Sequence, residues 1–563
     1  MKMNSKKVLG LAIAVFFSVT GVFAGSNEKG IDLYRAELYE AAKYFFLQQR
    51  NQTPQEQAEN QYYLGQTYYQ LQKPDSAAYY YAKAIETAPE YPFGYIGEGE
   101  LTLKKGDTKG ADALFKKAIG FAKKDASVQT TIAEVYANAG LYPQAEEALE
   151  KAQKVNKKYS GIYLVKGDIA LKTGNRDQAY GWYDQAIYFD KNDKASYLKL
   201  ARGYKDNNET VALDYLDKLV AIDPDYIPAY ALIGDINRDN GMYLQALKAY
   251  EKFISIPGVP VLQHERYAQL LYFTDQYEKS LQQIDYVLQQ DPANPVMHRI
   301  QAYDNFKLDN SALALQQLGQ FLQDNPADKH IYLDYTTYGR LLLKEKQSAA
   351  AVDAFQKAAA LDPTKSEVYK ELATAYEKAN NYPEAVKQYD KYFEVEQTPV
   401  VFDYFYYGQN NYSAASKYID PAYLATVTSP EQKQLDNEAF QGFINKGDGA
   451  FSEVISRSPD SYLGYIWRAH LHALVDAKSQ EVKGAAMQGD AKPYYEKALE
   501  VMVNNNADGK RNNDILDAYR YLGSYYLLLD DKANAGDYYK KILEIDPENT
   551  DAKTVLTTLK IKY

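Results

Sequence analysis

Small residues recur along this chain at an interval of 34, and this regularity limits the folds that the chain can adopt. From Gly65 to Gly99 the spacing is 99 − 65 = 34, and the same interval leads on through Ala133 and Gly167 to Ala201. The series continues at spacings of 33 to 37 residues through Gly234, Ala268, Ala302, Gly339, Ala373 and Gly408. A constant period of this length is typical of an array made from one repeated supersecondary unit.

A second small residue follows about 12 positions later in most units, as at Ala77 (77 − 65 = 12). Turn-forming Asp-Pro pairs, such as Asp223-Pro224 and Asp362-Pro363, separate successive units. Each unit therefore reads as two antiparallel helices that approach closely at their small residues. Such a hairpin is too thin to bury its own apolar stripe, so the units must stack on one another.

The stretch Tyr62–Pro89 shows the pattern in full, with Leu64, Gly65, Tyr68, Ala77, Tyr81, Ala84 and Pro89 at fixed offsets. This pattern resembles the tetratricopeptide repeat family, and the resemblance extends from about Asn60 to Pro547. It implies an all-α fold, a right-handed superhelical solenoid of about thirteen stacked helix pairs.

Departures from the period predict the domain organisation. We expect a signal peptide at 1–24, an N-terminal capping helix within 25–58 (Ile31–Gln48), a regular array at 59–411, an irregular helical region with insertions at 412–490, and C-terminal repeats with a capping helix at 491–563. In the irregular region we expect a helix at Pro430–Ile444, a turn into the next helix at Ile444–Phe451, and a projecting polar loop at Lys478–Asp490.

The first residues favour export. Lysines at positions 2, 6 and 7 precede an apolar run at Val8–Val19, and Val22-Phe23-Ala24 offers the small residues of a cleavage site after Ala24. An uncleaved membrane anchor is the alternative. We expect the mature protein in the periplasm of a Gram-negative bacterium, with secretion as the other destination, and no further membrane span. The chain has no cysteine, which excludes a lipoprotein anchor and disulfides.

The residues that remain do not form a catalytic or metal-binding pattern. There is no phosphate loop, nucleophile elbow or dinucleotide fingerprint, and His470 and His472 point to opposite sides of a helix. The net charge without the three leader lysines is 61 − 75 = −14, which disfavours a nucleic-acid partner. We expect a protein that is not an enzyme and that has no cofactor and no metal.

The segment Asp403–Tyr412 shows how the register sorts the many tyrosines. Tyr404 and Tyr407 fall at positions that pack between helices, whereas Phe405 and Tyr406 fall on another stripe. In the tetratricopeptide family that stripe lines the concave groove, where Arg202 also falls. The ligand-binding residues predicted there are Tyr272, Arg299, Tyr303, Phe306, Arg340, Phe405, Tyr406 and Trp467.

Rigid aromatic side chains beside arginines are typical of binding hot spots. The leading hypothesis is therefore an exported adaptor that binds protein or peptide partners in its groove and assists assembly or regulation of a cell-envelope complex. The alternative is a carbohydrate-binding solenoid that stacks sugars on its tyrosine and tryptophan rings. A third hypothesis is an array that associates with itself.

Overall fold

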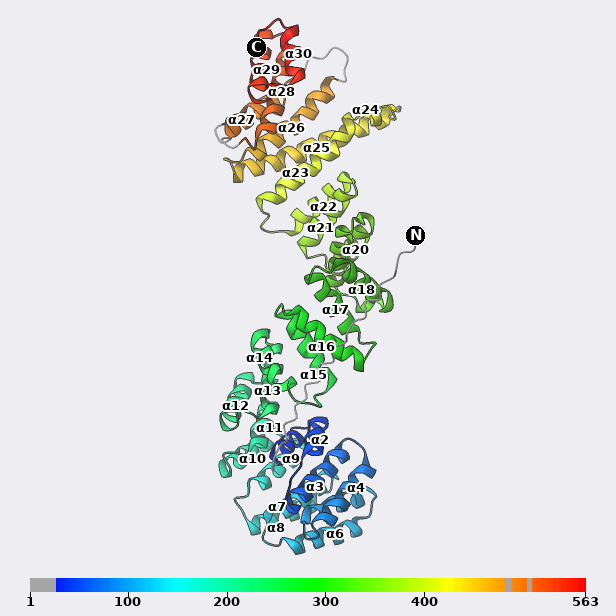
Figure 1. Cartoon of the computed structure of the whole chain (residues 1–563), viewed down its shortest axis with the longest axis vertical. Coiled ribbons are helices and arrows are strands. Elements are labelled where there is room, and N and C mark those ends of the chain that lie inside the picture. Colours follow the sequence, from blue (N-terminus) through cyan, green and yellow to red (C-terminus); the bar gives the residue numbers. More distant parts are fainter. Residues whose placement is uncertain (1–26, 481–487, 504–508) are drawn as a thin grey trace, which may run out of the picture. The chain divides into compact units, whose positions relative to one another are not determined.

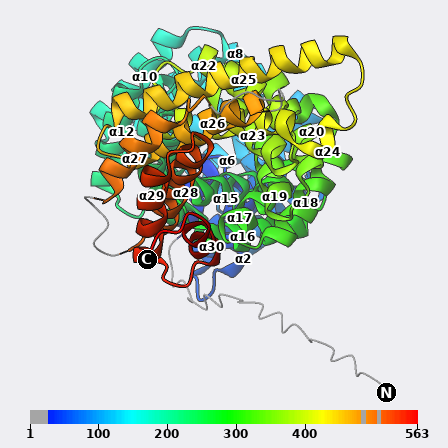
Figure 2. The same ribbon diagram turned by 90° about the horizontal axis from the view of Figure 1, so that it is seen from above.

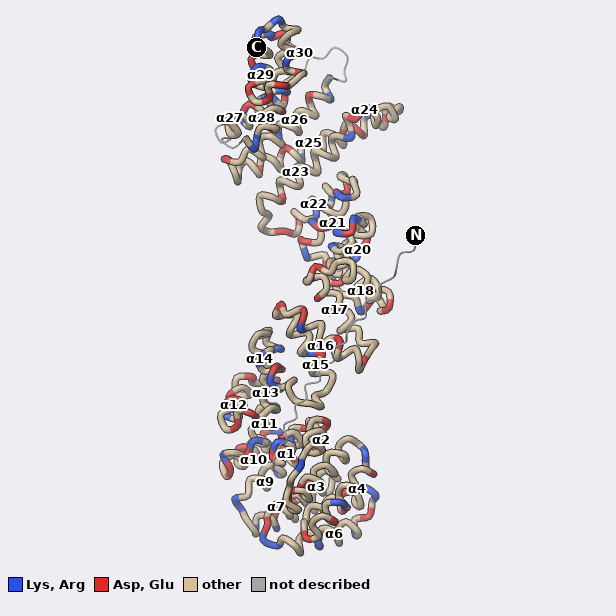
Figure 3. Tube along the Cα trace, viewed as in Figure 1, with Lys and Arg blue, Asp and Glu red and all other residues tan. Residues whose placement is uncertain are grey.

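The computed structural model describes residues 27–480, 488–503 and 509–563, and this part of the chain consists of helices joined by short turns (Figure 1). The expected leader at 1–24 lies outside the described residues. The chain divides into two compact units, residues 1–300 (unit 1) and 301–563 (unit 2). Charges of both signs are interspersed along the helices (Figure 3). Every helix within the described residues is too short or too polar to span a membrane.

In unit 1 two N-terminal helices precede the regular helix pairs. The helices are α1 (Glu28–Arg35), α2 (Tyr39–Gln48), α3 (Pro54–Gln70), α4 (Pro74–Thr87), α5 (Pro92–Lys104), α6 (Thr108–Phe121), α7 (Ala126–Asn138), α8 (Tyr142–Val155), α9 (Ser160–Lys172), α10 (Arg176–Phe189), α11 (Lys194–Tyr204), α12 (Glu209–Ile222), α13 (Ile227–Asp239), α14 (Tyr243–Ile254), α15 (Val261–Phe273) and α16 (Tyr277–Gln290). Helix α17 (Pro295–Lys307) contains the boundary between the units.

Unit 2 continues the pattern with one irregular pair. Its helices are α18 (Ser311–Asp324), η1 (Ala327–Lys329), α19 (Tyr332–Lys344), α20 (Ser348–Leu361), α21 (Ser366–Lys378), α22 (Tyr382–Val395), α23 (Val401–Ser416), η2 (Lys417–Ile419), α24 (Pro421–Leu424), α25 (Pro430–Arg457), α26 (Tyr462–Gln480), α27 (Lys492–Val503), α28 (Asn512–Leu528), α29 (Lys532–Ile545) and α30 (Thr550–Thr558). From α3/α4 to α28/α29, with α23 paired to α25, the described chain forms thirteen consecutive pairs, and the predicted all-α array is confirmed.

Close contact between a small residue and an aromatic ring explains the period. A Cβ atom added at Gly65 would lie 2.4 Å from the ring of Tyr81, and one added at Gly167 would lie 2.3 Å from Tyr183. The same contact recurs between Gly408 on α23 and Phe451 on α25. The first small position is therefore fixed by the ring that the second helix of the pair buries against it.

The N-terminal region differs from the single helix expected at Ile31–Gln48. The chain breaks at Glu37, which has a left-handed φ of 66°, and forms α1 and α2 instead. Helix α2 packs against α3, where the ring of Phe46 stacks on Tyr63 at 5.9 Å. Helix α1 turns away and contacts α11 and α13, far along the chain.

The irregular region also differs from expectation. The turn predicted at Ile444–Phe451 is wrong, because these residues lie inside α25, which runs without a break for 28 residues and stands out in Figure 2. The last part of α25 pairs with α23 in the place of a normal second helix. The loop predicted at Lys478–Asp490 lies partly outside the described residues, since α26 extends to Gln480 and the description resumes at residue 488.

Candidate functional site

Charged side chains link the first helices of successive pairs in unit 2. Arg340 on α19 pairs with Glu371 on α21 at 2.5 Å, and Lys370 on α21 pairs with Asp403 on α23 at 2.6 Å. Asp403 is almost fully buried and also accepts a hydrogen bond from the Tyr392 hydroxyl at 2.6 Å. Although burial acts to raise it, the hydrogen bonds from Lys370 and Tyr392 hold the pKa of Asp403 below its usual value.

An aromatic cluster continues this line from α23 to α26. The Trp467 ring lies 6.1 Å from Phe405, 5.5 Å from Tyr412 and 6.3 Å from Phe451. Next to Trp467, Nε2 of His470 lies 2.9 Å from the Asp517 carboxylate on α28. We call these side chains together the first-helix line; it comprises Arg340, Glu371, Lys370, Asp403, Phe405, Trp467, His470 and Asp517.

Two aromatic side chains project from α23 beside the first-helix line. Phe402 is 61% exposed and Tyr406 is 46% exposed, and their ring centres are 6.4 Å apart. They lie one helical turn apart on α23, and Lys370 on α21 supplies a cation through its ion pair with Asp403, which follows Phe402 in the sequence. Exposed aromatic rings next to a cation that already has a partner form a surface suited to a partner with apolar and acidic groups.

The predicted ligand-binding residues are divided between the two units. Arg340, Phe405, Tyr406 and Trp467 lie on the first helices of unit 2; of these four residues, Arg340 and Tyr406 are exposed, while Phe405 and Trp467 are half-buried in the cluster. Phe306 is also in unit 2, half-buried on α17. Tyr303 is buried and donates its hydroxyl proton to Asp334.

Tyr272 and Arg299 are both half-buried and belong to unit 1.

Sequence reasoning missed Phe402, although it lies four residues before Tyr406 on the same stripe. It also missed the contact of His470 with Asp517. The two histidines on α26 diverge as expected, because His472 contacts Asp448 instead, at 2.8 Å. Within the described residues, acidic and histidine side chains nowhere gather into a metal site.

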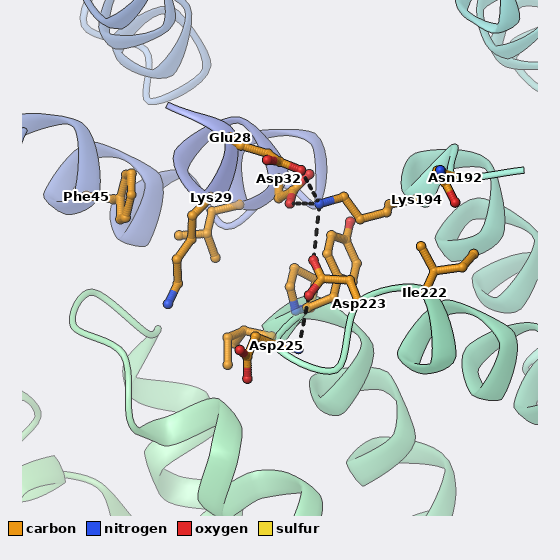
Figure 4. A pocket seen from close by; sticks show the side chains of 13 residues that line it. Glu28, Lys29, Asp32, Phe45, Asn192, Lys194, Ile222, Asp223 and Asp225 are labelled. Carbon is orange, nitrogen blue, oxygen red and sulfur yellow. Dashed lines mark hydrogen bonds and ion pairs between the residues drawn. The ribbon is translucent and has the colours of Figure 1, made fainter. Parts of the chain in front are cut away.

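In unit 1 the corresponding surface is already in contact with α1. Nζ of Lys194 on α11 lies 3.0 Å from Glu28, 2.5 Å from Asp32 and 3.1 Å from Asp223, so one cation holds two carboxylates of α1 and one from the array (Figure 4). Burial raises the pKa of Asp32, and the hydrogen bond from Lys194 opposes this effect. Lys194 also lies 5.4 Å from the ring centre of Tyr226.

Further contacts hold the C-terminal end of α1. The Arg202 guanidinium donates to the Ala36 carbonyl at 2.7 Å, and the Tyr34 hydroxyl donates to Gln66 at 3.0 Å. Arg202 was predicted to face the groove, and its guanidinium contacts the chain's own N-terminal segment at Ala36. At Gly258 an added Cβ would lie 2.8 Å from the Ala41 Cα, so the loop before α15 approaches α2 closely.

Five segments match family models described as the tetratricopeptide repeat, at residues 59–91, 130–197, 227–258, 342–401 and 517–549. A search of curated proteins finds no significant match. Among solved structures, the C-terminal part of a TPR repeat-containing protein from Cytophaga hutchinsonii is 25% identical, with 52% of this chain and 99% of that chain covered and a TM-score of 0.38.

Two further solved structures have lower identity. Pseudomonas aeruginosa PilF is 16% identical over 38% of this chain and 98% of that chain, with a TM-score of 0.32. Yeast Tom70 is 15% identical over 69% of this chain and 94% of that chain, with a TM-score of 0.26. Since these TM-scores are below 0.5, the family assignment rests on the matched repeats and on the thirteen helix pairs that keep their register. The chain is a tetratricopeptide repeat protein.

Proposed function

We propose that this protein is a non-catalytic exported scaffold that binds a protein or peptide partner along the first helices of unit 2 and takes part in assembling or regulating a cell-envelope complex. The observation that carries the proposal is the exposed pair Phe402 and Tyr406 beside the first-helix line. Exposed aromatic rings on a rigid helix lose little conformational entropy when a partner covers them. Proteins of this repeat family bind other proteins, which supports the same function.

A protein partner is favoured over a carbohydrate. The carbohydrate alternative rests mainly on Trp467, because an exposed indole face would stack on a sugar ring. Trp467 is half-buried, and the rings of Phe405, Tyr412 and Phe451 pack around it. The indole therefore contributes to the packing of α23, α25 and α26, and the exposed rings beside it belong to Phe402 and Tyr406.

We expect the double substitution Phe402→Glu/Tyr406→Glu to abolish partner capture without unfolding the protein. Both rings are exposed, so the free energy of unfolding should change by no more than about 0.5 kcal/mol for each substitution. Wild type and variant, bound to a matrix, are incubated with envelope extract, and the retained proteins are identified by mass spectrometry.

The matched control is Leu313→Glu, which places a charge at another exposed apolar residue of unit 2. Leu313 lies on α18, which is the second helix of its pair. Proteins that bind wild type and control but not the double variant support the proposed surface. Equal retention by all three proteins would contradict it. A wild-type protein that captures only itself would instead favour self-association.

Export is tested separately. The lysines, the apolar run and the small residues at positions 22–24 support cleavage after Ala24. We expect the protein isolated from a Gram-negative host to begin at Gly25 and to be released with the periplasmic fraction. An N-terminal sequence that begins at Met1, in a chain that stays with the membranes, would show an uncleaved anchor.

A further inference from the structure

A cavity of about 820 Å³ lies between α22 and the last part of α25 in unit 2, and this volume is in the range of small-molecule sites (Figure 1). The rings of Tyr404 and Tyr407 on α23 line it, and Phe393 on α22 stacks on Tyr404 at 4.9 Å. Phe402 and Tyr406 do not line it. This α22/α25 cavity is therefore separate from the surface proposed above for a protein partner.

An equivalent cavity elsewhere in unit 2 allows a comparison. Tyr335 and Tyr338, at the same register positions of α19, line a smaller cavity of about 310 Å³ between α18 and α20. Its wall holds one acidic side chain, Asp353, and one basic side chain, Lys357, so the charges balance. The wall of the α22/α25 cavity holds four acidic side chains and one basic side chain, Lys446. The larger cavity thus has an excess of negative charge that its equivalent lacks.

The four acidic side chains differ in the partners that they already have. Asp390 and Glu396 are bonded to neighbouring side chains. Glu453 pairs with Arg457 at 3.2 Å, and half of the Glu453 side chain stays exposed. Glu394 is exposed and has no hydrogen bond or ion pair within the described part of the chain. Glu394 on α22 and Glu453 on α25 therefore offer negative charge to a ligand from the two helices that flank the cavity.

A lysine that recurs in other pairs is replaced here by Glu453. In five pairs a lysine two residues after the buried ring of the second helix lies over the ring of the tyrosine 22 residues earlier. The distances from Nζ to the ring centre are 4.3 Å for Lys117 and Tyr95, 4.1 Å for Lys252 and Tyr230, 5.5 Å for Lys357 and Tyr335, 6.0 Å for Lys391 and Tyr369, and 5.7 Å for Lys541 and Tyr519. On α25 the residue two positions after the buried Phe451 is Glu453. Arg457, one helical turn further on, lies over Tyr404 at 4.7 Å and does not line the cavity. A carboxylate thus stands on the wall where the other pairs have an ammonium group.

Gly449 leaves part of the α25 backbone open to the cavity. It lies inside the helix, where glycine is less stable than other residues. Close packing does not require it, because an added Cβ would meet no atom within 4 Å, whereas one at Gly447 would lie 2.9 Å from Leu471. The equivalent position in the smaller cavity is Asp353. Gly449 therefore leaves room for a ligand where the equivalent pair has a side chain.

The lining favours an organic cation over a metal ion. In the described part of the chain, acidic and histidine side chains are nowhere close enough together to coordinate a metal. A longer cation can pack its hydrocarbon part on the rings of Phe393 and Tyr407 while its charged end meets a carboxylate. We propose that the α22/α25 cavity binds an alkyl guanidinium or alkyl ammonium group, which belongs either to a small molecule or to an arginine or lysine side chain of a partner. This site does not depend on the surface of Phe402 and Tyr406, so the two proposals can fail separately.

The test is isothermal titration calorimetry of the full chain with butylguanidinium in a buffer of low ionic strength. We expect binding with a Kd of about 1 mM or lower. Butylurea has nearly the same shape without the charge, and it should bind about ten times more weakly. The proposal is wrong if butylurea binds equally well, or if butylguanidinium at about 10 mM gives no binding signal.

Substitution of the two available carboxylates locates the site. Glu394→Gln/Glu453→Gln should weaken butylguanidinium binding by about a factor of ten and leave the protein folded, because both side chains are exposed. The matched control is Glu431→Gln/Glu438→Gln, which removes the same charge at exposed residues in the first part of α25 and should leave binding unchanged. Equal weakening by both variants would show that the ligand responds only to net charge, and would overturn the proposal.

A single substitution restores the lysine of the other pairs. Glu453→Lys should give a folded protein, since lysine occupies this position in five pairs, and this protein should no longer bind butylguanidinium. Retained binding would contradict a site that includes Glu453.

A second ligand identifies the source of the cation. N-acetylarginine methylamide carries the same guanidinium group on a peptide backbone. Binding as tight as that of butylguanidinium would assign the site to a side chain of a partner. Binding about ten times weaker would assign it to a small molecule, because the backbone would then be too large for the cavity.

Discussion

Replacing Asp476 with alanine is expected to destabilise the C-terminal part of unit 2 by about 3–5 kcal/mol. The Asp476 side chain is completely buried near the end of α26. Its carboxylate accepts hydrogen bonds from the backbone N–H groups of Gly489 (2.8 Å), Asp490 (2.9 Å) and Ala491 (3.0 Å). It also accepts one from the Tyr521 hydroxyl on α28. Alanine would leave these donors, of which the N–H group of Ala491 is buried, without their acceptor.

Two further substitutions make this prediction specific. Tyr521→Phe removes only one of the donors and should cost about 1 kcal/mol. Asp537→Ala, at an exposed carboxylate on α29, should change the free energy of unfolding by less than about 0.5 kcal/mol. Chemical unfolding gives these values, and hydrogen exchange at Gly489 and Ala491 locates the effect. A loss of stability below about 1 kcal/mol for Asp476→Ala would show that water replaces the carboxylate at little cost.

The Asp476 site also shows what the sequence could not reveal. A lone aspartate near the end of a polar helix is usually solvated, and nothing in the spacing indicates that backbone groups 13 to 15 residues later will surround it. The regular pairs were predictable for the opposite reason. Gly65 and Tyr81 meet within one unit, so their contact leaves a local and repeated mark in the sequence.

The continuous helix α25 was mispredicted because two glycines were taken as the mark of a turn. Gly447 and Gly449 each cost about 1 kcal/mol in a helix interior. On the same helix Phe440, Ile444 and Phe451 are buried, and this burial offsets the cost. Gly447 is itself buried, and a Cβ there would lie 2.9 Å from the Leu471 side chain. Packing against α26 thus requires a glycine at position 447. The low helix propensity of glycine, taken alone, had indicated the end of a helix there.

The position of α1 depends on the curvature of the whole first unit. Which helix Asp32 reaches is set by the small rotation between successive repeats, summed over the pairs that separate α3 from α11. No single position in the sequence encodes this summed rotation. The prediction that Arg202 faces the groove needed only the register of its own helix. The predicted residues Tyr272 and Arg299 could not be assigned to unit 1 by register, because the period continues across the boundary between the units.

Replacing Glu100 with glutamine is expected to stabilise unit 1 at pH 8 by about 3 kcal/mol and to leave its stability at pH 4 nearly unchanged. Glu100 is 5% exposed on α5. It accepts hydrogen bonds from Gln66 at 2.8 Å and from the Tyr81 hydroxyl at 3.4 Å. Burial raises its pKa to about 7; the hydrogen bond from Gln66 opposes the shift, and the charge of Glu134 adds to it.

The sign of the pH dependence follows from proton binding. Between pH 4.5, the ordinary pKa of a glutamate side chain, and about pH 7, the folded state keeps the proton that the unfolded state has released. The stability contributed by this group therefore falls as the pH rises through that window, and it is constant above it. Glutamine keeps the acceptor oxygen and never ionises, so Glu100→Gln should lack this loss.

Urea unfolding at several values between pH 4 and pH 8.5 measures the difference between Glu100→Gln and wild type, in which the contributions of titrating groups that do not interact with Glu100 cancel. The matched control is Glu98→Gln, two residues earlier on α5, at a carboxyl that is not fully buried. Gln66 also accepts the hydrogen bond from Tyr34, so the Gln66 side chain connects Glu100 to α1. A difference that stays constant with pH would mean that Glu100 is ionised throughout, and that water reaches it in the folded protein.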